Sequence, residues 1–160
     1  MKFDYDNYKR ANKIKESWPD EMPLLPRDKV FIALIAGLVL LTVVHGMLNY
    51  SGLTADDRSD LRWWLFFDVL IACAAIAQMV FPQPMFLADE AIRRPAEMLI
   101  DGMRLFCGVA GVTFALFFGY TLESDLLAMV PFDVRVIFGF CAVMVIELVA
   151  YFVWLSRGKK

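Results

Sequence analysis

The segment from Val30 to Asn49 contains no Asp, Glu, Lys or Arg. An uncharged apolar run of about 18 residues or more can cross the hydrocarbon core of a bilayer as an α-helix. Composition agrees, since 59% of the residues are hydrophobic and 21% are charged. Soluble domains are closer to half apolar and a quarter charged. The sequence therefore predicts an integral membrane protein.

Three further apolar runs follow the first one. Because lipid offers no hydrogen-bond partners to the backbone, only helices and closed barrels can cross it, and these runs lack the alternation of barrel strands. The sequence therefore predicts an all-α, four-transmembrane-helix bundle. The expected spans are about 30–50, 63–81, 103–122 and 134–155. They form a transmembrane domain, 30–156, between an N-terminal segment, 1–29, and a basic tail, 157–160.

The basic residues are distributed unevenly between the predicted connections. Of the 16 Lys and Arg residues, thirteen lie in the segment 1–29, in the connection after the second span, and around the C-terminus. Basic connections stay on the cytoplasmic side of a membrane. We therefore expect both termini to be cytoplasmic, in a bacterial inner membrane. Segment 1–29 lacks the pattern of a cleavable signal, so we expect it to remain in the mature protein.

The connection between the second and third spans contains the sequence AIRRPAEMLIDGMR, residues 91–104. Pro95 suits a first helical turn. Three apolar residues then fall at helical spacing opposite three charged ones: Met98, Leu99 and Met103 against Glu97, Asp101 and Arg104. This pattern predicts a short amphipathic helix on the inner membrane surface. A polar hairpin loop is the alternative.

Small residues recur every four positions along the third span. They are Cys107, Gly111, Ala115 and Gly119. Small residues at this spacing let two helix backbones approach closely within lipid. The stripe packs either inside the four-helix bundle or against another subunit.

Three ionisable residues fall inside the predicted spans: His45, Asp68 and Glu147. A charge at the bilayer centre costs at least ~2.5 kcal/mol, so such residues usually face inward and find partners. Counting about 1.5 Å per residue from the span ends places His45 and Asp68 at one level of the first hairpin. We expect an intramembrane polar pair in which the carboxylate accepts the imidazole N–H.

Two other roles for His45 stay open. The imidazole could take part in proton conduction or ion coordination, or it could bind a cofactor, namely haem or a chlorophyll-type pigment. Glu147 lies more than about 10 Å deeper, by the same count. Its expected partner is Tyr151, one helical turn farther along. A hydrogen bond from Glu147 to a partner subunit is an equal alternative.

Enzymatic and metal-binding signatures are missing from the sequence. Cys73, Cys107 and Cys141 lie at three different depths and cannot converge on one tetrahedral metal. The chain has no P-loop, HExxH, GxSxG or glycine-rich nucleotide turn. Its basic residues lie at the membrane surface among acids, which argues against nucleic acid as a partner. We therefore expect a protein that is not an enzyme.

The function that fits these features is that of a small, non-catalytic membrane subunit. It would assemble with other integral membrane subunits, or with copies of itself, in an energy-transducing or transport complex. The alternative is a homo-oligomeric channel or carrier in which Asp68, His45 and Glu147 line a path between copies. A third possibility is a pigment- or haem-binding subunit that uses His45.

Overall fold

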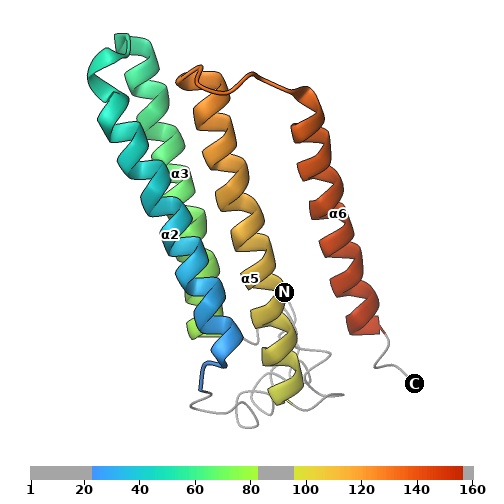
Figure 1. Cartoon of the computed structure of the whole chain (residues 1–160). Coiled ribbons are helices and arrows are strands. Elements are labelled where there is room, and N and C mark those ends of the chain that lie inside the picture. The colour runs from blue at the N-terminus through green and yellow to red at the C-terminus, as the bar shows by residue number, and fades with distance from the viewer. Residues whose placement is uncertain (1–22, 83–95, 157–160) are drawn as a thin grey trace, which may run out of the picture.

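The structure is a computed structural model that describes residues 23–82 and 96–156 (Figure 1). Its long helices are α2 (Pro26–Asn49), α3 (Ala55–Val80), α5 (Ala96–Thr121) and α6 (Val134–Ser156). All four are long and apolar enough to cross a membrane, and the described residues contain no strand. The all-helical, four-span prediction is confirmed to this extent.

Helices α2 and α3 form a tight hairpin. The last turn of α2 tightens into the 3-10 turn η1 (Tyr50–Gly52). Thr54 then caps α3, because its hydroxyl accepts the backbone N–H of Asp57 at 3.3 Å. The guanidinium carbon of Arg58 lies 5.3 Å from the centre of the Tyr50 ring, a cation–π contact across the turn.

These contacts explain why α3 starts earlier than the predicted span, which begins at residue 63. The helix begins at Ala55 and includes a charged first stretch. The cap and the arginine contacts with Tyr50 and the Ser51 carbonyl hold these residues in helical form. The helix is therefore about two turns longer than its apolar part.

The predicted surface helix between the second and third spans is not a separate element in the described residues. Residues 83–95 lie outside the described part of the chain, and residues 96–104 form the first turns of α5. Their apolar side is buried inside the protein: Leu99, Ile100 and Met103 are almost fully covered. The predicted faces hold only in part: Leu99 and Met103 pack on protein, but Met98 is exposed, and Arg104, predicted on the polar side, is buried.

Helix α5 ends in an unusual turn. It passes directly into η3 (Leu122–Leu126), a π-helical turn, in which the N–H of Leu127 donates to the carbonyl of Leu122 at 3.0 Å. The chain then turns away at Ala128, whose φ of 51° lies in the left-handed region that disfavours side chains with a Cβ. Single π turns of this kind often occur at functional sites.

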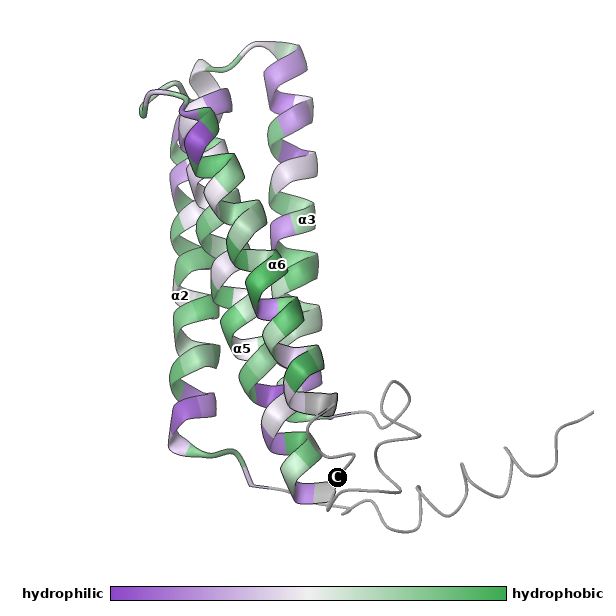
Figure 2. Cartoon of the chain, turned by 90° about the vertical axis from the view of Figure 1, so that its right-hand side faces the viewer, coloured by the Kyte–Doolittle hydropathy of each residue, from purple (hydrophilic) through white to green (hydrophobic). Residues whose placement is uncertain are grey.

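Helices α2, α3 and α5 pack together, and α6 lies to one side against α5 (Figure 1). Apolar residues cover most of all four helices, and hydrophilic residues gather toward their ends (Figure 2). The main core cluster comes from the first three helices only. Its buried members are Ile35, Val39, Ala72, Met79 and Ala115.

The small-residue stripe of α5 is used inside the chain. A Cβ added to Gly111 would lie 2.6 Å from the Ile35 side chain and 3.1 Å from the Cβ of Ala75. A Cβ on Gly119 would lie 3.2 Å from the hydroxyl of Thr42. Glycine therefore sets how closely α5 approaches α2 and α3.

We predict that Gly111→Ala destabilises the bundle, because the added methyl meets two packed side chains. The free energy of unfolding in mild detergent should fall by about 1–3 kcal/mol relative to Gly37→Ala. Gly37 is the matched control, since a Cβ there meets no atom within 4 Å. Equal stability of the two variants would contradict the close packing of α5 on α2.

Candidate functional site

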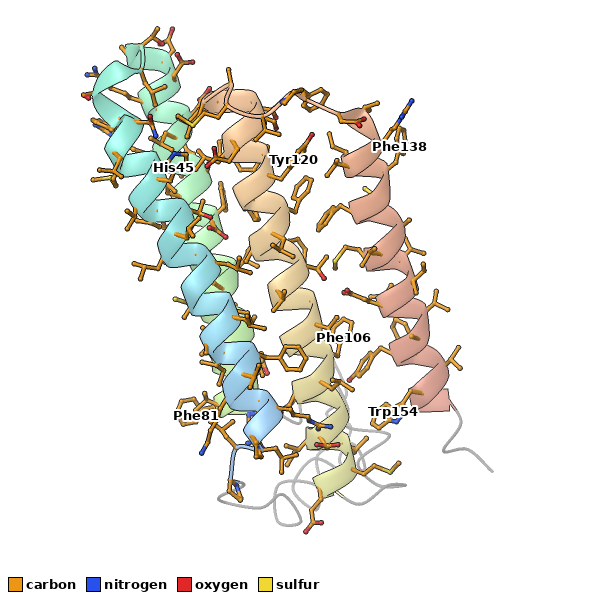
Figure 3. All side chains as sticks on the ribbon, viewed as in Figure 1. His45, Phe81, Phe106, Tyr120, Phe138 and Trp154 are labelled. Atoms are coloured by element: carbon orange, nitrogen blue, oxygen red, sulfur yellow. The ribbon has the colours of Figure 1, made fainter. Side chains whose placement is uncertain are left out.

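His45 forms a side-chain pair at the end of the molecule that carries the turns 50–54 and 122–133, called the turn end below. Its Nδ1 contacts a carboxylate oxygen of Glu123, the second residue of the π turn. Figure 3 places His45 near the turn end of α2. Asn49 donates to the His45 carbonyl at 2.9 Å, which fixes the adjacent backbone. The pair joins α2 to the end of α5.

The predicted His45–Asp68 pair is wrong, because the structure joins His45 to Glu123 instead. A Cβ on Gly46 would lie 3.1 Å from the Leu61 side chain and 3.5 Å from that of Leu65, so the stretch of α3 between these residues is level with this part of α2. Asp68 lies one to two turns farther along α3, roughly 5–10 Å away in depth. The error came from counting depth from residue 63, whereas α3 begins at residue 55.

Glu123 was missed because the predicted third span ended at 122, which assigned this acid to a loop. Counting residues from the neighbouring turns would have placed it near the level of His45. A carboxylate on one ring nitrogen fixes the imidazole tautomer and orients the other nitrogen. The arrangement can therefore position a proton on the ring, or orient it toward a ligand.

Asp68 lies within the interior of the three-helix core. Asp68 is 2% exposed, and its Oδ2 is buried without a hydrogen-bond partner. It lies one turn before Ala72, a member of the core cluster that also contains Val39 and Ala115. Leaving a buried carboxyl oxygen unpartnered costs free energy. Such a group is a candidate for binding a proton or a small cation.

The opposite end of the bundle contains a buried polar cluster. Arg104 is 1% exposed, and its Nε donates to the carbonyl of Met79 at 2.8 Å. Its Nη1 donates to the carbonyl of Pro23 at 3.0 Å and lies 3.7 Å from the carboxylate of Asp28. Asp28 is fully buried and also accepts the N–H of Leu25. One side chain thus connects three segments.

The sequence predicts Arg104 on the polar side of a surface helix and gives no specific role to Asp28. A signal was present, because Arg104 follows Ile100 by one helical turn and therefore shares its buried side. Arg27 forms two further ion pairs at the same end, one with Asp28 at 3.5 Å and one with Asp101. The side chains of Arg27 and Asp101 are each about 40% exposed, so their pair contributes less.

Glu147 links α6 to α5. Its Oε1 accepts the hydroxyl of Thr113 at 2.8 Å, and its Oε2 is buried without a partner. The predicted bond to Tyr151 is not made. That residue instead stacks its ring on Phe106, with centroids 4.6 Å apart.

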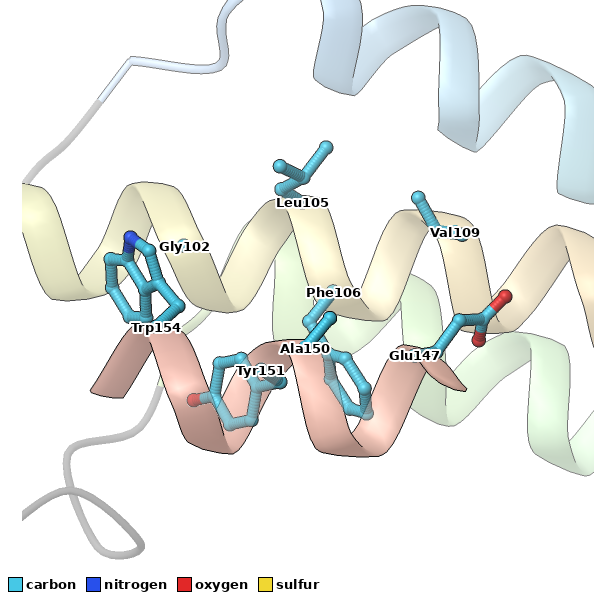
Figure 4. A pocket seen from close by; sticks show the side chains of 8 residues that line it. All are labelled: Gly102, Leu105, Phe106, Val109, Glu147, Ala150, Tyr151 and Trp154. Atoms are coloured by element: carbon cyan, nitrogen blue, oxygen red, sulfur yellow. The ribbon is translucent and has the colours of Figure 1, made fainter. Parts of the chain in front are cut away.

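A pocket of about 300 Å³ lies between α5 and α6 (Figure 4). Its wall includes the aromatic rings of Phe106, Tyr151 and Trp154, and Glu147 lies at one end. The indole of Trp154 sits directly on Gly102, where any Cβ would overlap with it. The remaining lining is aliphatic.

Cys73, Cys107 and Cys141 are free thiols. In the part of the chain that the structure describes, no group of three or more His, Cys, Asp or Glu residues lies close enough to hold a metal ion. The polar groups are thus spread over separate places: His45 with Glu123, Asp68, the Arg104 cluster, and Glu147.

Comparison with known proteins assigns no family. No protein-family model matches the chain, and no curated protein or solved structure is significantly similar to it.

We predict that His45 and Glu123 are energetically coupled and that His45 and Asp68 are not. A double-mutant cycle with His45→Ala and Glu123→Ala should show a coupling of about 0.5–3 kcal/mol in the free energy of unfolding. The cycle with His45→Ala and Asp68→Asn should be additive within about 0.5 kcal/mol. The reverse pattern would restore the pairing expected from the sequence.

Proposed function

We propose that the protein is a small, non-catalytic subunit of a larger membrane assembly with an energy-transducing or transport role. It would lie in a bacterial inner membrane with both termini cytoplasmic. The proposal depends on how the fourth helix is held. No residue from 134 to 154 is buried, although the helix is among the most apolar in the chain.

Helix α6 attaches to the bundle along one side. Phe140 stacks on Phe117 with centroids 4.0 Å apart, and Tyr151 stacks on Phe106. Its other sides expose large apolar residues, among them Phe138, Val145, Ile146 and Phe152. A Cβ on Gly139 meets no atom within 4 Å, so this open side also has a small residue where another helix backbone can approach.

The distribution of charge supports the proposed orientation. Arg27, Lys29 and Arg104 belong to the end of the bundle where α2 and α5 begin. At the turn end lie Arg58, Arg62 and Arg135, so the described helices carry three basic residues at each end. The excess of basic residues on the first side comes from the sequence next to it, residues 1–22, 83–95 and 157–160. Under the positive-inside rule, the first end would be cytoplasmic.

We predict that the protein purifies in mild detergent with stoichiometric, unrelated membrane proteins, measured by native mass spectrometry. Gly139→Leu should remove these partners by filling the open side of α6. Gly37→Leu makes the same change on an open side of α2 and should leave them bound. A preparation containing only copies of this chain would contradict the proposal.

A homo-oligomeric carrier is the second candidate, and the observation that favours it is Asp68. A fully buried acid with an unpartnered oxygen in a bundle of this kind marks ion or proton pathways in membrane proteins. Movement through the protein would then require this carboxyl group to exchange a proton or cation.

If the protein is a carrier, Asp68→Asn should abolish ion or proton flux in proteoliposomes while the protein still assembles. Asp60→Asn is the matched control, because Asp60 lies on the same helix but is exposed. Flux that survives Asp68→Asn would remove this candidate. Assembly with unrelated subunits and no flux would favour the first proposal.

A further inference from the structure

We propose that the pocket between α5 and α6 binds a lipophilic organic ammonium ion. The carboxylate of Glu147 would supply the counter-charge, and the rings of Phe106, Tyr151 and Trp154 would supply the aromatic wall. This inference goes beyond the proposed function, because it concerns a small ligand and depends on no partner protein.

The charge of the site comes from a single carboxylate group, that of Glu147. Thr113 already donates to Oε1 of Glu147, while Oε2 is buried and accepts no hydrogen bond. Within 23–82 and 96–156, no Lys, Arg or His forms an ion pair with Glu147. Glu147 lines the pocket, so a cation there would lie near this carboxylate and supply its counter-charge, and the Thr113 bond would hold the carboxylate in place.

The aromatic wall selects for an organic cation. Tyr151 stacks between Phe106, at 4.6 Å, and Trp154, at 6.0 Å, so the three rings form a continuous ladder. In Figure 4 the ring of Phe106 lies between the ring of Tyr151 and the side chain of Glu147. Aromatic ring faces attract ammonium groups, especially where water is excluded.

The same features argue against an inorganic cation. Calcium and magnesium ions require about six to eight oxygen ligands, which carboxylates, carbonyls and water supply. Here one carboxylate oxygen lies beside aromatic and aliphatic side chains. An ammonium ion with methyl or aryl substituents needs only one anion and apolar surroundings.

The size of the pocket limits the ligand. At about 300 Å³ it lies at the small end of the range that holds drug-sized molecules. A single aromatic ring with one quaternary ammonium group fits this volume better than a large polycyclic cation. Benzyltrimethylammonium is therefore a suitable probe, and neopentylbenzene is its uncharged isostere.

The test is equilibrium binding of radiolabelled benzyltrimethylammonium to the full chain in mild detergent. Saturable binding is expected, and unlabelled probe should displace the label whereas neopentylbenzene should not. Glu147→Gln should weaken binding at least tenfold, since the amide oxygen can still accept from Thr113 but carries no charge. Asp60→Asn is the control, because Asp60 is an exposed acid on α3, and it should bind as the unaltered protein does.

A second variant keeps the proposal testable if Glu147→Gln does not fold, as judged by gel filtration and thermal unfolding. Phe106→Leu should retain the pocket and the carboxylate but weaken binding of the ammonium probe several-fold. Two results would overturn the proposal. One is no saturable binding by folded protein. The other is equal displacement by neopentylbenzene with no effect of Glu147→Gln, which indicates a purely apolar pocket that holds a lipid chain. Neither result bears on whether partner subunits are present.

Discussion

The structure depends most on one buried guanidinium group. Arg104 on α5 donates to the carbonyl at the end of α3 and to the carbonyl that precedes α2, and it lies beside the carboxylate of Asp28. These acceptors belong to backbone groups at or beyond helix ends, which otherwise have no partner. Three helices are therefore joined at one end by a single side chain. Asp28 also pairs with Arg27, whose Nε lies 3.5 Å from its Oδ1.

The rest of the three-helix unit follows from that junction. Above it, Gly108 and Gly111 let α5 approach Phe31 and Ile35 of α2 closely. At the turn end, His45 and Glu123 close the same pair of helices. Polar contacts thus hold both ends, and the buried polar residues between them are Asp68 and Thr42, whose hydroxyl donates to the carbonyl of Leu38. A carboxyl oxygen without a partner, such as Oδ2 of Asp68, is therefore unusual at that position.

The number and type of the helices could be predicted from the sequence. A long uncharged segment in lipid must satisfy its backbone hydrogen bonds within the protein, and these segments lack the alternation of barrel strands. The pairing of side chains could not. Depth was counted from the ends of the apolar runs, but Thr54 and Tyr50 stabilise two charged turns that belong to α3. That addition separates Asp68 from His45. The sequence also predicts Arg104 at the surface, because the hydropathy of a residue takes no account of the backbone carbonyls that can bind a buried guanidinium. The sequence does not predict the pocket beside Glu147, because the pocket depends on how α6 packs against α5.

The separation of α6 from the main core has a consequence for the order in which the protein is built. The core cluster contains no residue of α6, so α2, α3 and α5 can complete it before the last helix leaves the ribosome. Helix α6 then adds its own small cluster, in which Tyr151 and Trp154 pack on Leu99 and Met103. The pocket between α5 and α6 exists only after that last step. A molecule bound there would therefore stabilise the docked form of α6 over the undocked one, by mass action.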